Sequence, residues 1–186
     1  MKDRRFDQRT KAQFKTDIQR AHNIQGWLLE SWIKEMAANS YYVEYQDNGT
    51  DNSGRFVERA SSEPDYVVSI LDKLNITTTN CKLEVKTAPH YKYLNFKVES
   101  LKAVVEHNAH VLLFIGVDTK AEDKDTLLAS LKYASWCFFS PKTAEKILTL
   151  PARSVPSFYG GKPCIEIKAV DFDKWLRIHA FGKPIR

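Results

Sequence analysis

The sequence predicts an α/β protein, a three-layer α/β/α sandwich with a mixed central sheet. Segments with helical and strand patterns alternate along the chain, which is typical of this class. Hydrophobic residues make up 43% and charged residues 27% of the 186 residues, which suits one globular domain with a full core. The stretch 111–117 is continuously apolar, as expected for a central strand covered on both faces.

The N-terminal part predicts two helices. Residues 5–22 carry loosely spaced apolar positions, and we interpret 1–22 as a helical extension of the domain. A second helix is expected over 24–38, where Leu29, Ile33 and Met36 recur at helical spacing.

Three strands should follow, at 41–45, 66–71 and 81–86. Between the first two, residues 46–54 have the composition of a flexible loop, and we expect a short extended piece at 55–58.

The second half of the chain predicts further alternation. In order, we expect a helix at 96–108, strands at 111–117 and 133–139, a helix over 141–148, an irregular loop at 149–163, a strand at 164–170 and a helix at 172–178. Ser140-Pro141 supports the start of the helix over 141–148, because it resembles an N-cap followed by proline at the first helical position. We therefore predict a single domain over 1–186 with its core at about 24–170.

The net charge favours a polyanionic partner without establishing one. Lys and Arg number 28 against 23 Asp and Glu, a net charge of +5, and the excess is concentrated at residues 1–22 and 174–186. Basic surfaces gain affinity for nucleic acid by releasing its counterions. Solubility alone would explain the same charge.

Composition also predicts the compartment. No apolar run approaches the roughly 20 residues that span a bilayer, and the polar N-terminus lacks the features of a secretory signal. The three cysteines are odd in number, far apart and without metal-ligand spacing, so we expect them to be reduced. We predict a cytoplasmic protein with no membrane partner.

Two short motifs suggest chemistry: Glu63-Pro64-Asp65 and Leu83-Glu84-Val85-Lys86. Side chains alternate along a strand, so Glu84 and Lys86 share one face while Leu83 and Val85 point into a core. Two carboxylates and an ammonium group on one wet face suit a divalent cation and an activated water.

The two motifs converge if strands 66–71 and 81–86 form a hairpin. Pairing Asp65 with Glu84 centres the turn between Leu74 and Asn75, within a segment of turn-forming residues. The same register places the apolar side chains of both strands on one face and the charged ones on the other. A slip by one residue would bury the charges.

A hard ion such as Mg²⁺ takes oxygen ligands and keeps several waters. Asp65, Glu84 and the Val85 carbonyl would supply three ligands, and Lys86 would orient or deprotonate the attacking water. Glu30 is an additional candidate ligand, because the small residues Gly26 and Ala37 would let its helix approach the sheet closely.

These residues resemble the PD-(D/E)XK nuclease superfamily, which has the restriction-endonuclease-like fold. Pro64-Asp65 matches the PD element, Glu84-Val85-Lys86 matches ExK, and Gly26-x-x-x-Glu30 is similar to the acidic first helix of many members. The order of elements over about 24–117 (helix, three strands, helix, strand) agrees as well.

The resemblance implies a Mg²⁺-dependent DNA endonuclease in which Mn²⁺ substitutes for Mg²⁺. Asp65 and Glu84 would be metal ligands, Lys86 catalytic and Glu30 an accessory ligand. Basic residues that follow the ExK strand would contact DNA: His90, Lys92 and Lys97. A homodimer and a prokaryotic or phage-like origin are compatible with this family, and restriction, resolvase and repair roles all stay open.

Other readings remain. Asp and Glu-x-Lys on a strand often form only a solvated face, and Glu30 would then pair with Lys34. A non-catalytic nucleic-acid-binding module would keep the fold without the reaction. An interaction protein using exposed aromatic residues would bind little DNA even at low salt.

Overall fold

The structure is a computed structural model that describes residues 11–48, 63–89, 92–154 and 162–185. The helices are α1 (Lys11–Ala38), α2 (Val98–Glu106), α3 (Lys124–Ser130), α4 (Pro141–Leu148) and α5 (Ala169–Asp173). The strands are β1 (Tyr41–Asp47), β2 (Tyr66–Asp72), β3 (Thr77–Ala88), β4 (Tyr93–Lys97), β5 (Ala109–Ile115), β6 (Ser135–Phe139), β7 (Arg153–Ser154), β8 (Pro163–Lys168) and β9 (His179–Ala180).

The central sheet is mixed and has six strands in the order β1-β2-β3-β5-β6-β9. β1, β2 and β3 form an antiparallel meander, β5 runs parallel to β3, and β6 and β9 complete the sheet with antiparallel pairings. A second, smaller sheet joins β4, β8 and β7. The parallel β3·β5 pair requires a crossover, which β4 and α2 provide.

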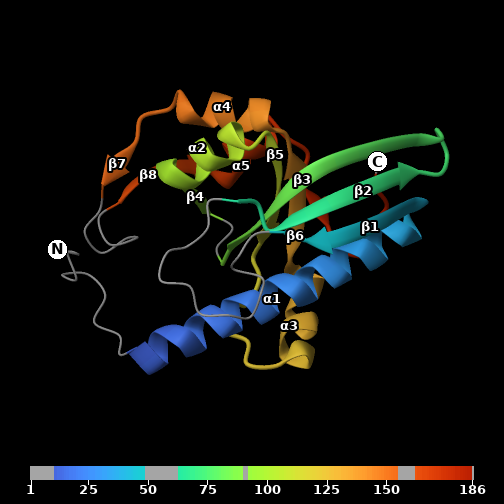
Figure 1. Ribbon diagram of the computed structural model, residues 1–186, viewed down its shortest axis with the longest axis horizontal. Helices are drawn as coiled ribbons and strands as arrows, with labels where there is room; N and C mark the ends of the chain where they lie inside the picture. Colours follow the sequence, from blue (N-terminus) through green and yellow to red (C-terminus); the bar gives the residue numbers. More distant parts are fainter. Residues whose placement is uncertain (1–10, 49–62, 90–91, 155–161, 186) are drawn as a thin grey trace.

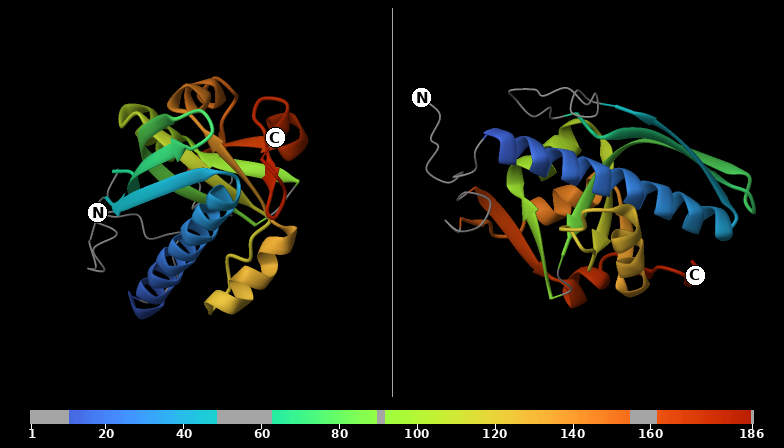
Figure 2. Two further views of the ribbon diagram at one scale, coloured as in Figure 1. Left: turned by 90° about the vertical axis from the view of Figure 1, so that its right-hand side faces the viewer. Right: turned by 90° about the horizontal axis from the view of Figure 1, so that it is seen from below.

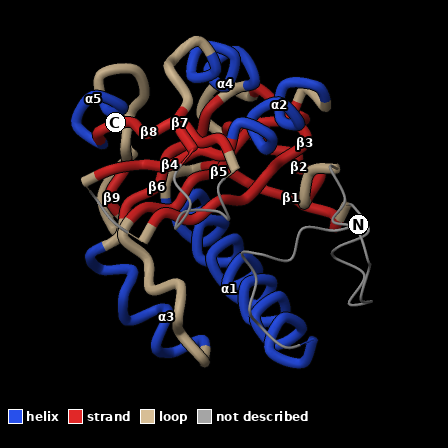
Figure 3. The backbone as a smooth tube through the Cα atoms, turned by 90° about the vertical axis from the view of Figure 1, so that its left-hand side faces the viewer, coloured by secondary structure: helices blue, strands red, loops and turns tan. Residues whose placement is uncertain are grey.

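Helices cover both faces of the central sheet, so the α/β class and the mixed sheet are confirmed (Figure 1). α1 and α3 lie together against one face, as Figure 2 also shows. α2, α4 and α5, with the small sheet, lie against the other face (Figure 3). A separate hydrophobic core fills the space on each face, and we call these the α1-side core and the α2-side core.

The predicted register of the β2–β3 hairpin is confirmed. Tyr66 pairs with Leu83 and Asp72 with Thr77, the offset that follows from placing Asp65 opposite Glu84. Tyr66, Val68, Leu83 and Val85 are all buried in the α1-side core. The alternation of apolar and polar residues therefore fixed the pairing, because any odd shift would exchange the two faces.

The turn of this hairpin is held by Asp72. Its carboxylate accepts hydrogen bonds from the backbone N–H groups of Leu74 and Asn75 (2.9 and 3.2 Å) and from the Asn75 amide (2.7 Å). These bonds lower the pKa of Asp72. Ile76 closes the turn with φ 54°, a left-handed conformation that is unfavourable for a β-branched residue.

Several expectations about local structure are wrong. Residues 11–38 form one helix rather than two, because Asn23 continues the helix without a break. Residues 96–97 belong to β4 rather than to the following helix, which begins at Val98. α3 and β9 were not expected; β9 pairs with β6, and Phe181 stacks on Phe114 of the core.

Among the described helices, none combines the length and apolar character needed to span a membrane.

Candidate active site at the end of the β2–β3 hairpin

The site lies where the central sheet passes from a covered to an open face. Ala88 of β3 is buried in the α2-side core, whereas Lys82, on the same face of β3, is exposed. Glu84 and Lys86 lie between these two positions. In Figure 1 the β1–β2–β3 ribbon extends to the right beyond α2 and α4.

Asp65 is fixed to β3 by a hydrogen bond. Its Oδ2 accepts from the backbone N–H of Val85 at 2.7 Å. Val85 is completely buried, so this N–H needs a partner within the protein. The bond places the first carboxylate of the predicted set directly beside the Glu84-Val85-Lys86 segment.

The segment before Asp65 is held by Asn48 at the end of β1. The Asn48 side chain donates to the Pro64 carbonyl, and its backbone N–H donates to the Asp65 carbonyl, both at 2.9 Å. Extending the β2–β3 register places Pro64 opposite Val85. Proline has no N–H, so it offers the Val85 carbonyl no donor.

Gln25 of α1 supplies that missing donor. Its Nε2 donates to the Val85 carbonyl at 3.1 Å. Gln25 was not expected at the site, although the sequence holds a signal for it: Gln25 lies three, four and seven positions before Leu28, Leu29 and Trp32, which are all buried. A polar residue on the buried stripe of a helix needs a polar partner in the core.

Glu84 and Lys86 form an ion pair on the same face of β3. The side chains are 17% and 36% exposed, so water screens the pair only in part. The structure thus brings together Asp65, Glu84, the Val85 backbone and Lys86, as the sequence predicted.

Glu30 has a different neighbour. Its carboxylate forms an ion pair with Lys124 of α3, rather than with the Lys34 considered from the sequence. Five residues separate Glu30 from Gln25, which turns the two side chains about 140° apart around the helix. Because Gln25 faces Val85, Glu30 faces away from it.

The reason given for a close approach of α1 is also wrong. A Cβ atom added at Gly26 would meet nothing within 4 Å, and Ala37 is exposed. The small residues therefore do not mark a tight contact between α1 and the sheet.

Lys97 lies beside Lys86 at the start of α2. Burial first, and then the charges of Lys86 and Lys162, lower the pKa of Lys97. Lys162 also pairs with Glu99 at 2.9 Å. The ammonium groups of Lys97 and Lys162 therefore lie near Lys86, with Lys86 paired to Glu84 and Lys162 to Glu99.

Lys92, which was also expected to contact DNA, lies away from these lysines. Lys92 is five residues from Lys97, about 16 Å along β4, and its ammonium group lies over the Tyr93 ring at 5.6 Å from the centroid. His90 lies outside the described residues.

Asp65 and Glu84 are the carboxylates that could take part in holding a metal ion beside the Val85 backbone. Within the described residues, no group of three or more His, Cys, Asp or Glu side chains is placed to hold a metal ion. Mg²⁺ is usually held by one or two carboxylates with waters and substrate phosphates. A carboxylate has about four acceptor positions, so the bonds to Val85 and Lys86 are compatible with coordination.

Comparisons with known proteins give no family for this chain: no family model, no curated protein and no solved structure matches it.

Proposed function

We propose that this protein is a metal-dependent endonuclease that hydrolyses phosphodiester bonds in DNA. The observation that carries the proposal is the hydrogen bond from Val85 N–H to Asp65, which joins one carboxylate to the strand that carries Glu84 and Lys86. Two carboxylates, a backbone carbonyl and an ammonium group then lie at one end of a hairpin, on a chain of net charge +5.

The topology supports a restriction-endonuclease-like fold. α1 precedes the antiparallel β1–β2–β3 meander, and α2 leads into β5 beside β3. This is the order of elements that the PD-(D/E)XK resemblance implies, with the short strand β4 added before α2.

Asp65, Glu84 and the Val85 carbonyl would hold Mg²⁺, with Mn²⁺ as a substitute. The bound ion would lower the pKa of a water and neutralise charge on the phosphate. Gln25 positions the Val85 carbonyl, and Pro64 with Asn48 positions Asp65. Lys86, on the same face as Glu84, would take a proton from the attacking water or bind the phosphate as substrate enters.

The direct test is cleavage of supercoiled plasmid and of branched DNA with Mg²⁺, with Mn²⁺ and with EDTA. Glu84→Gln and Lys86→Met should each lower the cleavage rate by about 10²–10⁴-fold, the range for loss of a group acting on the reacting atoms. EDTA should abolish cleavage by the wild-type protein.

Two matched substitutions serve as controls. Glu44→Gln changes an exposed carboxylate on β1 of the same sheet. Lys73→Met changes an exposed lysine at the opposite end of the hairpin, eight residues or about 26 Å along β2 from Asp65. Both should cleave like the wild type. Metal-independent cleavage, or equal cleavage by the Glu84 and Lys86 variants, would refute the proposal.

The rival hypothesis, a non-catalytic nucleic-acid-binding module, gives a different result in the same experiment. It predicts salt-dependent DNA binding with no cleavage by any variant under any metal condition.

A further inference from the structure

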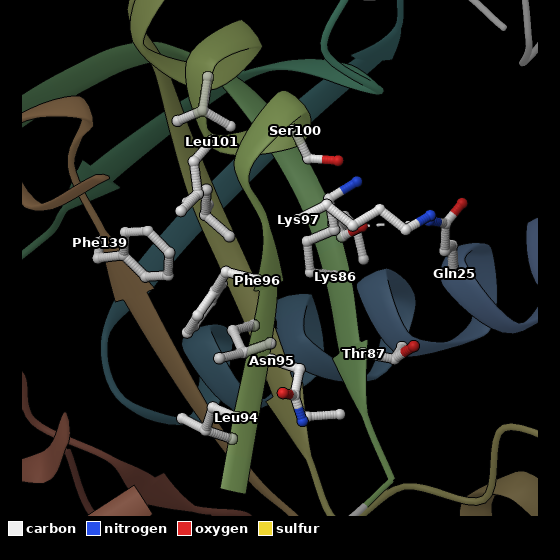
Figure 4. Close-up of a pocket in the computed structure, with 15 residues that line it drawn as sticks. Gln25, Lys86, Thr87, Leu94, Asn95, Phe96, Lys97, Ser100, Leu101 and Phe139 are labelled. Atoms are coloured by element: carbon white, nitrogen blue, oxygen red, sulfur yellow. Dashed lines mark hydrogen bonds between the residues drawn. The ribbon is translucent and has the colours of Figure 1, made fainter. Parts of the chain in front are cut away.

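A cavity of about 200 Å³ lies between β3, β4 and α2, next to the Glu84–Lys86 pair. One side of it is polar and is formed by Lys86, Thr87, Asn95, Lys97 and Ser100. The other side is apolar and includes Leu94, Phe96, Leu101, Val104 and Phe139. In Figure 4, Lys86, Lys97 and Ser100 lie on the side nearer Gln25, and the labelled apolar residues lie on the opposite side.

The volume of the cavity is enough for one aromatic ring. An engineered apolar cavity of about 150 Å³ binds benzene. A cavity of about 200 Å³ therefore has room for a six-membered pyrimidine ring, whereas the fused rings of a purine need more space. Phe96 and Phe139 provide aromatic surface for such a ring.

The polar side suits the rest of a nucleotide. Lys86 and Lys97 lie together there, and Lys86 also pairs with Glu84; an anion between the two ammonium groups reduces the repulsion that remains between them. Thr87, Asn95 and Ser100 offer hydroxyl and amide groups for a sugar or for the edge of a base.

We infer that this cavity binds an unpaired pyrimidine nucleotide, with its phosphate against Lys86 and Lys97 and its base in the apolar part of the cavity, against the edge-to-face pair of Phe96 and Phe139. The inference deepens the proposed function and rests on it for the identification of the nucleotide as part of a DNA strand. A base in a duplex stays in the stack unless it is extruded. The substrate is therefore DNA with an unpaired nucleotide beside the scissile bond, such as a single strand, a flap or a mismatch.

Binding is measured in EDTA, so that cleavage plays no part. The probes are dTMP, dAMP, thymidine and inorganic phosphate. We expect dTMP to bind about tenfold more tightly than inorganic phosphate, since stacking one base on aromatic side chains is worth about 1–3 kcal/mol. Thymidine should bind more weakly than dTMP because it lacks the phosphate, and dAMP because its fused rings exceed the cavity. Equal binding of dTMP and phosphate would overturn the inference.

NMR of the wild-type protein locates the ligand without any substitution. The methyl signals of Leu94, Leu101 and Val104 should shift with dTMP and not with phosphate. Shifts confined to other methyl groups would place the base elsewhere and would contradict the inference.

Val104→Phe fills the cavity from α2 and should reduce dTMP binding to the level of phosphate. Val105→Phe is the matched control, because Val105 lies on the same helix, packs on the α2-side core and does not line the cavity. Melting curves establish that both variants are folded. If Val104→Phe binds dTMP as the wild type does, the cavity is not the binding site.

The source of the nucleotide is tested with oligothymidylate and with paired and mismatched duplexes. Tighter binding of oligothymidylate and of a mismatched duplex than of a perfect duplex is expected. Binding of dTMP without binding of oligothymidylate would instead indicate a free nucleotide as ligand and would overturn the DNA assignment. Because these experiments contain no metal, failure of cleavage alone would affect only the proposed function.

Discussion

Replacing Asp65 with alanine should destabilise the protein even when no metal is present. The substitution removes the acceptor of the Val85 N–H, a bond of 2.7 Å to a completely buried residue. A hydrogen bond to a charged group contributes about 1.5–3 kcal/mol. Relief of repulsion between Asp65 and Glu84 would oppose this loss only weakly, because Lys86 already pairs with Glu84.

For a protein of 186 residues, 1 kcal/mol corresponds to about 2–4 °C in Tm. Asp65→Ala should therefore lower Tm by about 3–12 °C in EDTA. Asp65→Asn keeps an oxygen acceptor for the Val85 N–H, and its loss of stability should be about 1 kcal/mol or less. The asparagine variant should still lose metal-dependent cleavage, since the charge of the carboxylate is gone.

Urea unfolding in EDTA measures these differences, with an unchanged m value as the sign that only stability has changed. Glu44→Ala, an exposed carboxylate on β1, is the control and should stay within about 0.5 kcal/mol of the wild type. If Asp65→Ala unfolds at the wild-type urea concentration, the hydrogen bond to Val85 does not hold Asp65 in place. The geometric basis of the site would then be wrong.

Two further predictions concern Lys97 and Ile76. Burial and neighbouring charges lower the pKa of Lys97 in the folded protein. Between this lowered pKa and the ordinary lysine pKa, the unfolded state binds more protons than the folded state, so the stability of the wild type rises with pH. Lys97→Met should remove this rise and increase Tm at neutral pH. It should also reduce the salt dependence of DNA binding by about one phosphate contact. An unchanged Tm and an unchanged salt slope would contradict this prediction. Ile76→Gly should stabilise the protein by about 0.5–1 kcal/mol in urea unfolding. The substitution removes the steric strain of a left-handed β-branched residue, and the larger chain entropy of glycine in the unfolded state offsets part of this gain. A loss of stability would show that the backbone of Ile76 is not strained.

The sequence was most informative where polarity alternates strictly. β2 and β3 each place apolar residues on one face and polar or charged residues on the other, so only one register keeps both sets in suitable surroundings. This register places Asp65 beside the strand segment that carries Glu84 and Lys86. The central strand β5 and helix α4 were predicted for equally local reasons, a continuous apolar run and a Ser-Pro start.

The sequence was less informative where a partner lies far along the chain. β4 pairs with β8, about 70 residues later, and its five residues resemble the start of the helix that follows. α3 is short, although Asp123 marks its start by accepting from Thr126 N–H at 2.8 Å. Neither element has enough residues for its own periodicity to be decisive.

On α1, the sequence drew attention to Glu30 and not to Gln25 for a related reason. The acidic residue Glu30 attracted attention because metal sites need carboxylates, whereas the site uses the neutral Gln25 to satisfy a backbone carbonyl. That requirement arises from Pro64 opposite Val85, a long-range pairing. Only the register of the hairpin, combined with the orientation of α1, reveals it.

We propose that Asp65, Glu84 and the Val85 carbonyl hold one divalent ion. Anomalous diffraction from crystals soaked in Mn²⁺ tests it directly. We predict one strong peak within coordination distance, about 2.0–2.2 Å, of oxygen atoms from Asp65 and Glu84, lost in Asp65→Asn and in Glu84→Gln. A peak at other residues, or no peak beside Asp65 and Glu84 at saturating Mn²⁺, would contradict the account.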